Sequence, residues 1–437
     1  MRNVVVIGAG ASGLAAAIAA ARAGAHVTVL EGDVKPGRKL LRTGNGRCNL
    51  TNARIDVAAG DDEGHRHRHG GNDDERYRHF EDAAPLSMYN DPSFVRPTLE
   101  RLGCREIVDF FSSIGLLCYE DQEGRMYPVT NRARSVLDVL VGECARLGAS
   151  IECGKHVREI REGDAGFGAL LDDGSVVHAD AIVLATGAEA APVASLSLPL
   201  VPQAPVLGAL RTAPDIVRRM EGVRMRCGVR VEGRDLAAEG EVLFRPFGVS
   251  GIVVFDLSRF IGEGDVLSLD LLPFMERDAL MEELERRKLR DYAPLASGAS
   301  LDSKRSAKRA KKRASELDGM VLRLFDGLVV REVADAVLAY CGLDTGIRPA
   351  DLPVDRVADA LKDLRLTVTG GPEAAEAQAM RGGIATDAVD AESLAIDGHP
   401  GLYACGETLD VDAACGGFNL HWAWASGLTA GASAANR

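Results

Sequence analysis

The fold of this chain is decided by the stretch Val4-Val5-Val6-Ile7-Gly8-Ala9-Gly10-Ala11-Ser12-Gly13 and by the run Val27-Thr28-Val29-Leu30-Glu31 that follows it. An apolar run, a glycine turn, an alanine-rich segment over residues 14–23 and a second apolar run predict a strand, a turn, a helix and a parallel strand. Gly8 allows the turn, Gly10 lets a ligand approach the backbone, and Gly13 lets the helix pack closely on the strand. We therefore expect a β-α-β unit of an α/β domain.

The glycine turn and the acid after it predict a site for a dinucleotide. Free N–H groups at the N-terminus of the helix bind a pyrophosphate, and Glu31 is placed to accept the hydroxyls of a ribose. An acid at this position favours the unphosphorylated adenosine ribose of FAD or NAD over that of NADP. The alternative is a turn that binds no nucleotide, because a chain with 48 glycines can match GxGxxG by chance.

Length, charge and cysteine usage limit the class of protein. The 437 residues are enough for two or three domains, and a net charge of −13 argues against a general nucleic-acid binder. Nine cysteines without a CxxC pair or zinc-type spacing predict reduced thiols, no structural disulfide and no metal site. No apolar run has the length of a membrane span, and the N-terminal run lacks the features of a signal peptide. We expect a cytoplasmic protein with no membrane partner.

A loop rich in glycine, basic and amide residues follows the first unit, from Lys35 to Asn52. Its donors can hold phosphate or the polar edge of a ring, and its glycines permit close approach of the backbone. A solvated surface loop is the alternative, because most basic loops are of that kind.

Two polar segments stand apart from this pattern. Residues 56–79 have almost no apolar side chains and are expected to form a mobile insertion. Four histidines lie between His65 and His79, but their spacing matches no closed zinc site. The basic run at 304–313 has the charge to touch nucleic acid or phosphate. A solvated helix face is favoured, because the chain is acidic and no aromatic residues are interleaved.

The rest of the chain predicts a discontinuous nucleotide domain with insertions. Apolar strands that end in Gly187 and Gly406 are typical of central parallel strands, so residues 1–190 and 376–437 are expected to form one domain. Alternating, proline-punctuated segments predict a mostly β domain over 191–275 and 340–375. A charged helical pattern predicts a helical domain over 276–339.

Several blocks together resemble the BaiN-like, or YhiN-type, FAD-dependent oxidoreductases, and the likeness covers most of the chain. The blocks are Gly8 to Gly13, Gly37 to Leu41, Gly44 to Asn52, Gly382-Gly383, Gly406 to Asp412 and Cys415 to Asn419, with Gly240 to Phe244 and Gly248 to Gly251 in the middle domain. The resemblance implies an α/β fold with a glutathione-reductase-type Rossmann-like FAD domain, an inserted barrel-like β domain and a small helical domain.

The resemblance also implies which residues contact FAD. It assigns Glu31 to the adenosine ribose, the loop 37–52 to the flavin side, and Glu407 with the turn 416–419 to the ribityl chain and isoalloxazine ring. The predicted cofactor-binding residues are Gly8, Gly10, Ala11, Ser12, Gly13, Glu31, Gly32, Arg38, Lys39, Leu40, Gly44, Asn45, Gly46, Arg47, Cys48, Asn49, Val157, Ala185, Thr186, Gly187, Gly406, Glu407, Gly416, Gly417, Phe418 and Asn419.

Members of that family are described as NAD(P)H-linked flavoproteins, some of them similar to reductases of unsaturated steroid or bile-acid intermediates. The resemblance therefore implies FAD as cofactor, NAD(P)H as transient electron donor and a small enone-like acceptor as substrate. No second strand-linked GxGxxG marks a separate NAD(P)H domain. We expect the nicotinamide to visit the same flavin face as the second substrate.

Cys48 and Cys415 are the thiols nearest the predicted flavin, and each is a candidate proton donor or redox partner. The alternative, that both are small packing residues, is favoured because no CxxC joins them. His421 and Tyr403 are weaker candidates, since a histidine at a helix start is more often structural.

Two other functions stay open at this point. One is a flavoprotein that acts on or binds RNA through the basic run at 304–313. The other is a flavin-binding protein without turnover. The second is motivated by a departure from the family, in which a second glycine and a glycine-rich passage with a GDG element usually follow Gly187. Here Ala188 to Pro192 leads almost directly to the proline-rich Pro199 to Pro202.

Overall fold

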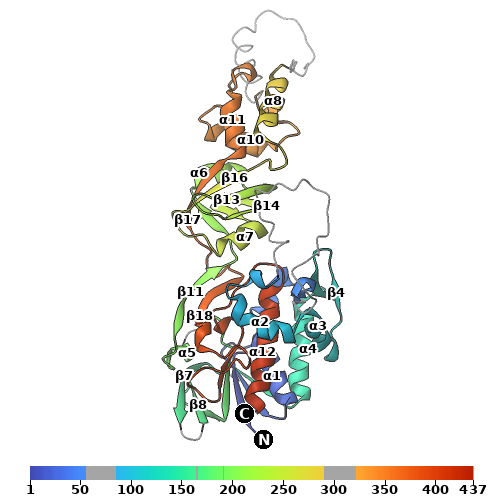
Figure 1. The fold of residues 1–437 in the computed structure, drawn as a ribbon, viewed down its shortest axis with the longest axis vertical. Coiled ribbons are helices and arrows are strands. Elements are labelled where there is room, and N and C mark those ends of the chain that lie inside the picture. The colour runs from blue at the N-terminus through green and yellow to red at the C-terminus, as the bar shows by residue number, and fades with distance from the viewer. Residues whose placement is uncertain (56–84, 164–165, 190, 290–320, 437) are drawn as a thin grey trace, which may run out of the picture. The chain divides into compact units, whose positions relative to one another are not determined.

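The computed structural model describes residues 1–55, 85–163, 166–189, 191–289 and 321–436 of the chain (Figure 1). These residues belong to two compact units. Unit 1 contains the described residues of Met1–His69, Ala83–Val206 and Gln378–Arg437, and unit 2 contains the described residues of Leu207–Ala377. The predicted polar insertion at 56–79 and the basic run at 304–313 lie outside the described residues.

Unit 1 is built on a five-stranded parallel sheet, as the two N-terminal apolar runs predict. From edge to edge its strands are β19 (Leu402–Ala404), β10 (Ala181–Leu184), β1 (Asn3–Ile7), β2 (His26–Glu31) and β6 (Ser150–Cys153). Val5 lies opposite Ile182 on one side and Thr28 on the other. Four of the five residues of β1 are buried, because helices and further strands cover both faces of the sheet. The first and last parts of the chain therefore share one sheet.

Two helices from opposite ends of the chain pack closely against each other and against this sheet. They are α1 (Ala11–Arg22) and α12 (Phe418–Asn436), side by side in Figure 1. A Cβ on Gly427 would lie 2.3 Å from the Ser12 carbonyl oxygen, and one on Gly431 would lie 2.1 Å from that of Ala16. Small residues on both helices thus permit this approach. α4 (Ala133–Arg146) contacts α1 as well.

Smaller sheets and helices complete unit 1. A three-stranded antiparallel meander joins β6 to β10 and consists of β7 (Val157–Gly163), β8 (Gly166–Leu171) and β9 (Val176–Ala179). A second antiparallel sheet contains β3 (Thr51–Asn52), β5 (Arg125–Pro128) and β4 (Cys118–Glu120). A two-stranded sheet pairs β11 (Leu200–Val206) with β18 (Ala379–Ile384). The remaining helices are α2 (Pro92–Arg101), α3 (Cys104–Ser113) and α5 (Ala191–Ala194).

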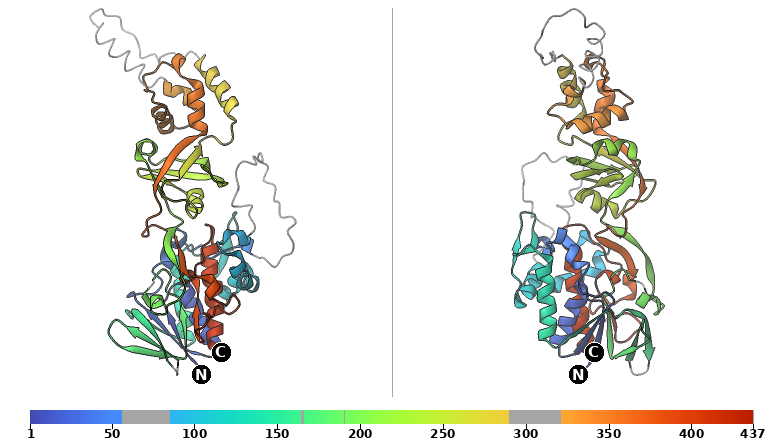
Figure 2. Two further views of the ribbon diagram at one scale, coloured as in Figure 1. Left: turned by 60° about the vertical axis from the view of Figure 1, so that its left-hand side comes forward. Right: turned by 180° about the vertical axis from the view of Figure 1, so that it is seen from behind.

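Unit 2 contains a closed β-barrel, which confirms that a barrel is present as predicted. Its strands, in order around the barrel, are β12 (Leu210–Thr212), β15 (Gly248–Ser250), β14 (Ala237–Arg245), β13 (Arg224–Val231), β16 (Val266–Asp270) and β17 (Leu364–Gly370). Two short helices, α6 (Pro214–Val217) and α7 (Ile252–Ser258), pack on the barrel. Three longer helices lie together at one end of it (Figures 1 and 2): α8 (Arg277–Lys288), α10 (Arg331–Tyr340) and α11 (Val354–Lys362).

A buried ion pair joins the barrel to these helices. Lys362 Nζ lies 2.7 Å from Asp270 Oδ2 and donates hydrogen bonds to the carbonyl oxygens of Leu272 and Met275, at 2.8 Å and 2.6 Å. The barrel and the helices also share one cluster of buried apolar residues. The division of this unit into a β-rich and a helical domain therefore stays a prediction.

The boundary between the units differs from the one predicted. The sequence pattern predicts that the inserted β domain begins at residue 191, but β11 pairs with β18 inside unit 1, and unit 2 begins at Leu207. This pairing joins strands far apart in sequence, so the local pattern carries no sign of it. Across the described ranges, no helix combines the length and apolar character needed to cross a membrane.

Candidate functional site

The candidate site lies at the carboxyl ends of β1, β10 and β19, where the glycine turn follows β1. Gly8 has φ of +106°. A Cβ on Gly8 would lie 2.3 Å from the Ala185 carbonyl oxygen, and one on Gly13 would lie 1.9 Å from the Gly8 carbonyl oxygen. Neither position can hold a side chain, because the turn, α1 and the end of β10 pack directly on one another. The turn and the close helix packing are as the sequence predicts.

Gly10 has a different environment from the other two glycines. Apart from Gly10 and its chain neighbours, no heavy atom of the described residues lies within 4 Å of the place where its Cβ would be. α1 begins directly after Gly10, which has no side chain that could cap the helix. The space beside Gly10 is therefore open next to the N-terminus of α1, where free N–H groups and the positive end of the helix dipole lie. This arrangement fits an anionic ligand such as a pyrophosphate.

Glu31, at the end of β2, is fixed beside the turn. Its Oε2 accepts a hydrogen bond from the Ala9 backbone N–H at 2.7 Å, and its Oε1 accepts one from that of Asp33 at 2.9 Å. Each carboxylate oxygen can accept a second hydrogen bond, so the group retains capacity for ribose hydroxyls. Of two further residues predicted to contact the cofactor, Gly32 directly follows Glu31 and is exposed, and Val157 is buried at the start of β7.

The loop after β2 brings the predicted basic residues to the same edge. Arg38 Nε lies 3.1 Å from Asp33 Oδ2. Arg47 stacks on the ring of Tyr127, with its Cζ 4.6 Å from the ring centroid. Leu40 is buried and begins a short 3₁₀ segment in which Gly44, Asn45 and Gly46 all have positive φ. Such a backbone needs glycine or asparagine, which explains the composition of the block.

Glu407 ties this loop to the end of β19. Its carboxylate pairs with Lys39 Nζ through Oε2 and accepts a hydrogen bond from the Met380 N–H through Oε1 at 2.9 Å. The next residue, Thr408, accepts a hydrogen bond from the Gly187 N–H at 3.1 Å. The ends of β10 and β19, which are far apart in sequence, are thereby fixed to each other.

The predicted flavin turn at 416–419 packs directly against residues 49–52. Asn52 Nδ2 donates to the Gly416 carbonyl oxygen at 3.1 Å, and a Cβ on Gly417 would lie 2.7 Å from the Thr51 carbonyl oxygen. Asn49 Oδ1 is buried here and has no hydrogen-bond partner among the described residues. A buried acceptor without a donor fits a ligand that carries an N–H group, as the isoalloxazine ring does.

The side chains of Asn419 and Ser12, both predicted to contact the cofactor, have contacts within the protein itself. The Asn419 side chain accepts from the Ala413 N–H at 2.9 Å and donates to the Ala413 carbonyl oxygen at 2.7 Å, so it holds its own loop. Ser12 is buried, and a Cβ on Gly406 would lie 2.5 Å from its Oγ. These side chains shape the backbone of the site.

Two of the three predicted catalytic side chains are completely buried. Burial raises the pKa of the Cys48 thiol to about 12, so it is protonated at neutral pH. His421 Nδ1 lies 2.7 Å from Thr51 Oγ1 and its Nε2 lies 2.8 Å from the Leu102 carbonyl oxygen. Burial lowers the pKa of His421 to about 4, so the ring is neutral. Tyr403 is buried on β19, whereas Cys415 is half-buried.

Sequence reasoning missed a second group of residues that hold the site. Arg381, on β18, pairs with the fully buried Asp412, with Nε 3.0 Å from Oδ2. Asp410 accepts a hydrogen bond from the Gly382 N–H at 2.9 Å. Ser426, on α12, accepts one from the Gly406 N–H at 2.9 Å. The signal available in the sequence was the pair of acidic residues Asp410 and Asp412 near a glycine pair. Carboxylates of this kind accept hydrogen bonds from the backbone N–H groups of extended loops.

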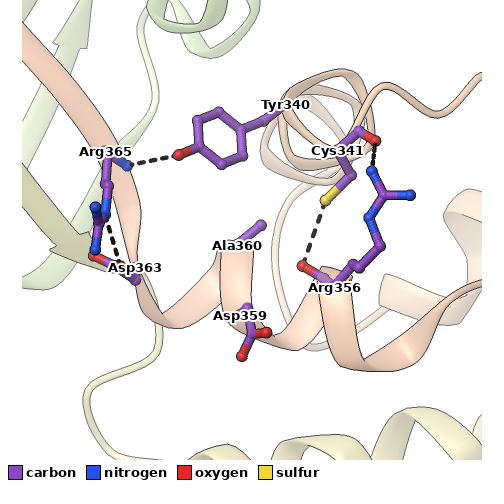
Figure 3. A pocket seen from close by; sticks show the side chains of 7 residues that line it. All are labelled: Tyr340, Cys341, Arg356, Asp359, Ala360, Asp363 and Arg365. Atoms are coloured by element: carbon purple, nitrogen blue, oxygen red, sulfur yellow. Dashed lines mark hydrogen bonds and ion pairs between the residues drawn. The ribbon is translucent and has the colours of Figure 1, made fainter.

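A separate hollow of about 310 Å³ lies in unit 2. Figure 3 shows its lining: Tyr340, Cys341, Arg356, Asp359, Ala360, Asp363 and Arg365. Arg365 pairs with Asp363 at 2.9 Å, and Arg356 donates to the Cys341 carbonyl oxygen at 2.6 Å. The charged groups of this hollow are engaged with the protein itself, which distinguishes it from the edge of the sheet in unit 1.

Comparison with known proteins agrees with this geometry. The family model described as HI0933-like protein Rossmann domain matches residues 2–68 and 78–433. The chain belongs to the HI0933-like family. The HI0933-like chain is 32% identical, over all of both sequences, to a 3-dehydro-bile acid delta(4,6)-reductase of Clostridium scindens. It is 25% identical to a ribosomal RNA dihydrouridine synthase of Escherichia coli, with 97% of this chain and 96% of that protein aligned.

Among solved structures, the HI0933-like chain is similar to a 3-ketosteroid-delta4-(5alpha)-dehydrogenase from Rhodococcus jostii. The match covers 100% of this chain and 97% of that chain, with 16% identity and a TM-score of 0.47. The family match and the full-length reductase relative identify the protein as a flavin-dependent oxidoreductase with a Rossmann-type domain. The expected flavoprotein class is therefore confirmed at this level.

Proposed function

We propose that this HI0933-like protein is a BaiN-like enzyme in which NAD(P)H reduces bound FAD and the hydride passes to a small unsaturated ketone of steroid or bile-acid type. The observation that carries the proposal is the full-length relationship to a bile-acid reductase at 32% identity. The open turn at Gly10, next to Glu31, supports a dinucleotide at the sheet edge.

Different residues of the site hold different parts of FAD. The open N–H groups after Gly10 bind the pyrophosphate, and Glu31 accepts the ribose hydroxyls. Asn49 and the turn 416–419 receive the ring end, where Asn49 Oδ1 offers its unused acceptor. Bound FAD supplies the hydride-transfer chemistry, and the chain supplies position and electrostatics.

Reduction of a conjugated double bond also needs a proton, and Cys415 is the candidate with accessible surface among the three predicted catalytic residues. A protonated thiol on the loop before α12 can deliver that proton. We assign the buried Cys48 and His421 to positioning, because each is held in one protonation state and His421 bonds to Thr51 in the predicted flavin loop.

The experiment is an anaerobic titration of the FAD-loaded protein with NADH and, separately, NADPH. We expect one of them to bleach the flavin absorbance, and a 3-oxo steroid acid with conjugated double bonds to restore it in repeated cycles. Saturated 3-oxo acids serve as the matched control and should restore nothing. A flavin that neither nicotinamide reduces contradicts the proposal and favours a flavin-binding protein without turnover.

A second candidate acceptor is a uracil base in ribosomal RNA. Ribosomal RNA dihydrouridine synthases of two bacteria match 97% of this chain at 25% and 23% identity. Their name and that of the bile-acid reductase both describe addition of hydrogen across a carbon–carbon double bond. The test is to incubate ribosomal RNA with the reduced protein and to look for dihydrouridine. Dihydrouridine in the product, together with RNA binding that weakens steeply with salt, would show that the acceptor is RNA and not a steroid. It would also contradict the expectation that the protein has no nucleic-acid partner.

A further inference from the structure

A polar bridge crosses the candidate FAD site outside the residues assigned to it so far. His156, three residues after β6, forms an ion pair through Nε2 with Glu189, which follows the end of β10. The other ring nitrogen, Nδ1, lies 3.0 Å from Asp172 Oδ2, in the turn between β8 and β9. Both partners of the bridge are partly exposed, with His156 at 38% and Glu189 at 45%.

The order of strands puts the nucleotide turn between the two partners. β10 and β6 flank β1 and β2 in the sheet, and the carboxyl ends of these parallel strands lie at one edge. A contact between the segments that leave β6 and β10 therefore passes the ends of β1 and β2, where Gly8 and Glu31 lie.

The backbone around the bridge is fixed on both sides. A Cβ on Gly32 would lie 3.1 Å from His156 Cδ2, so the ring packs on the residue directly after Glu31. The Lys155 N–H donates to the Glu31 carbonyl oxygen at 2.8 Å. On the other side, Thr186 Oγ1 donates to the Glu189 carbonyl oxygen at 3.0 Å. The two side chains thus meet from anchored turns.

We propose that His156 and Glu189 form a strap over the adenosine half of bound FAD, and that the strap slows release of the cofactor. The inference rests on the proposed FAD site and adds two positioning residues to it. An exposed ion pair contributes little binding free energy. The strap therefore lengthens the lifetime of the FAD complex but is not required for FAD to bind.

The strength of the strap should depend on pH, because the charge on His156 changes with pH. The groups that face it are Glu189, Asp172, the Lys155–Asp173 ion pair, and Glu31 and Cys153 at the ends of β2 and β6. Burial opposes protonation, but the hydrogen bond to Glu189 and the charges of Glu189 and Asp172 outweigh it and raise the pKa of His156. A raised histidine pKa means that the charged bridge is present at low pH and is lost as pH rises through that pKa.

The test measures FAD release from the loaded full-length protein, followed by flavin fluorescence after dilution. His156→Ala and Glu189→Gln should each release FAD about two- to fivefold faster, and the double variant no faster than the faster single variant. His399→Ala is the matched control, because His399 pairs with Glu162 near the other end of β7. It should leave the release rate unchanged.

Two further measurements complete the test. FMN, which lacks the adenosine half, should bind the wild type and His156→Ala equally. Release from the wild type should quicken as pH rises through the raised pKa of His156, and release from His156→Ala should not. Unchanged release in both single variants, or equal acceleration in His399→Ala, overturns the strap. A wild type that binds no FAD overturns the proposed function instead, so the two failures are distinguishable.

Discussion

The sheet edge of unit 1 and the junction between barrel and helices in unit 2 both bring buried polar groups together, but they satisfy them differently. At the junction, Lys362 uses its ammonium group on Asp270 and two carbonyl oxygens. At the sheet edge, Asn49 Oδ1 is buried and has no donor among the described residues.

This difference separates polar groups that stabilise the fold from polar groups that remain for a ligand. A buried polar group without a partner costs free energy, so Asn49 Oδ1 at the sheet edge is a group that a bound ligand can satisfy. The hollow of unit 2 in Figure 3 does not show this property, because the charged groups that line it are engaged with the protein itself.

The largest effect is expected at the junction in unit 2. Lys362→Met removes the ion pair with the buried Asp270 and two hydrogen bonds to carbonyl oxygens, which should lower the free energy of unfolding by about 3–5 kcal/mol. Denaturant unfolding measures it, with Arg348→Met as control, since the pair of Arg348 with Asp351 is exposed. The folded Lys362→Met variant should bind FAD with the affinity of the wild type. If the variant lost FAD affinity as well as stability, the junction could not be distinguished from the ligand site.

The next effect concerns the open glycine. Gly10 has φ of −81°, which other residues adopt, so Gly10→Val should fold normally while its side chain fills the space for the pyrophosphate. We expect FAD affinity to fall about 100-fold, or about 2.8 kcal/mol. Gly142→Val, at an exposed helical glycine with the same open surroundings among the described residues, is the control. Equal FAD affinity in both variants would mean that Gly10 faces no ligand.

The smallest effect is expected at Glu143, a carboxylate of unit 1 that is hydrogen-bonded to arginine side chains. A hydrogen bond from Arg146, against the opposing effect of burial, and a second from Arg22 lower the pKa of Glu143 to about 2. Glu143→Gln should cost about 1–3 kcal/mol of stability at neutral pH without changing FAD affinity.

The sign of the pH dependence follows from the lowered pKa. The stabilisation by Glu143 is complete above its ordinary value of 4.5 and is lost as pH falls towards 2. The difference in unfolding free energy between wild type and Glu143→Gln should therefore close over that interval. A difference that stays constant down to pH 2 would show that the ion pair contributes nothing.

The local parts of the site were predictable from sequence because they depend on backbone geometry. The roles of Gly8 and Gly13 follow from a strand that ends one residue before a tight turn, and the structure has this turn. The meeting of residues 49–52 with the turn 416–419 was expected only through the resemblance, since no local pattern connects segments 364 residues apart.

Other features could not be predicted because they depend on tertiary contacts. The amide of Asn419 and the ring of His421 were predicted to serve ligand and catalysis, yet both bond to the protein itself. The bridge between His156 and Glu189 joins two surface turns, and neither turn has a sequence signature. Barrel strands of three residues, such as β12 and β15, are too short to show alternation.

The most direct test of the account is a titration of the purified, flavin-free protein with FAD. We expect a yellow complex of one FAD per chain, which binds more tightly than FMN because the turn at Gly10 and the carboxylate of Glu31 contact the pyrophosphate and the ribose. Absence of a stoichiometric complex, or equal affinity for FAD and FMN, would contradict the claim that the open polar groups at the sheet edge hold a dinucleotide.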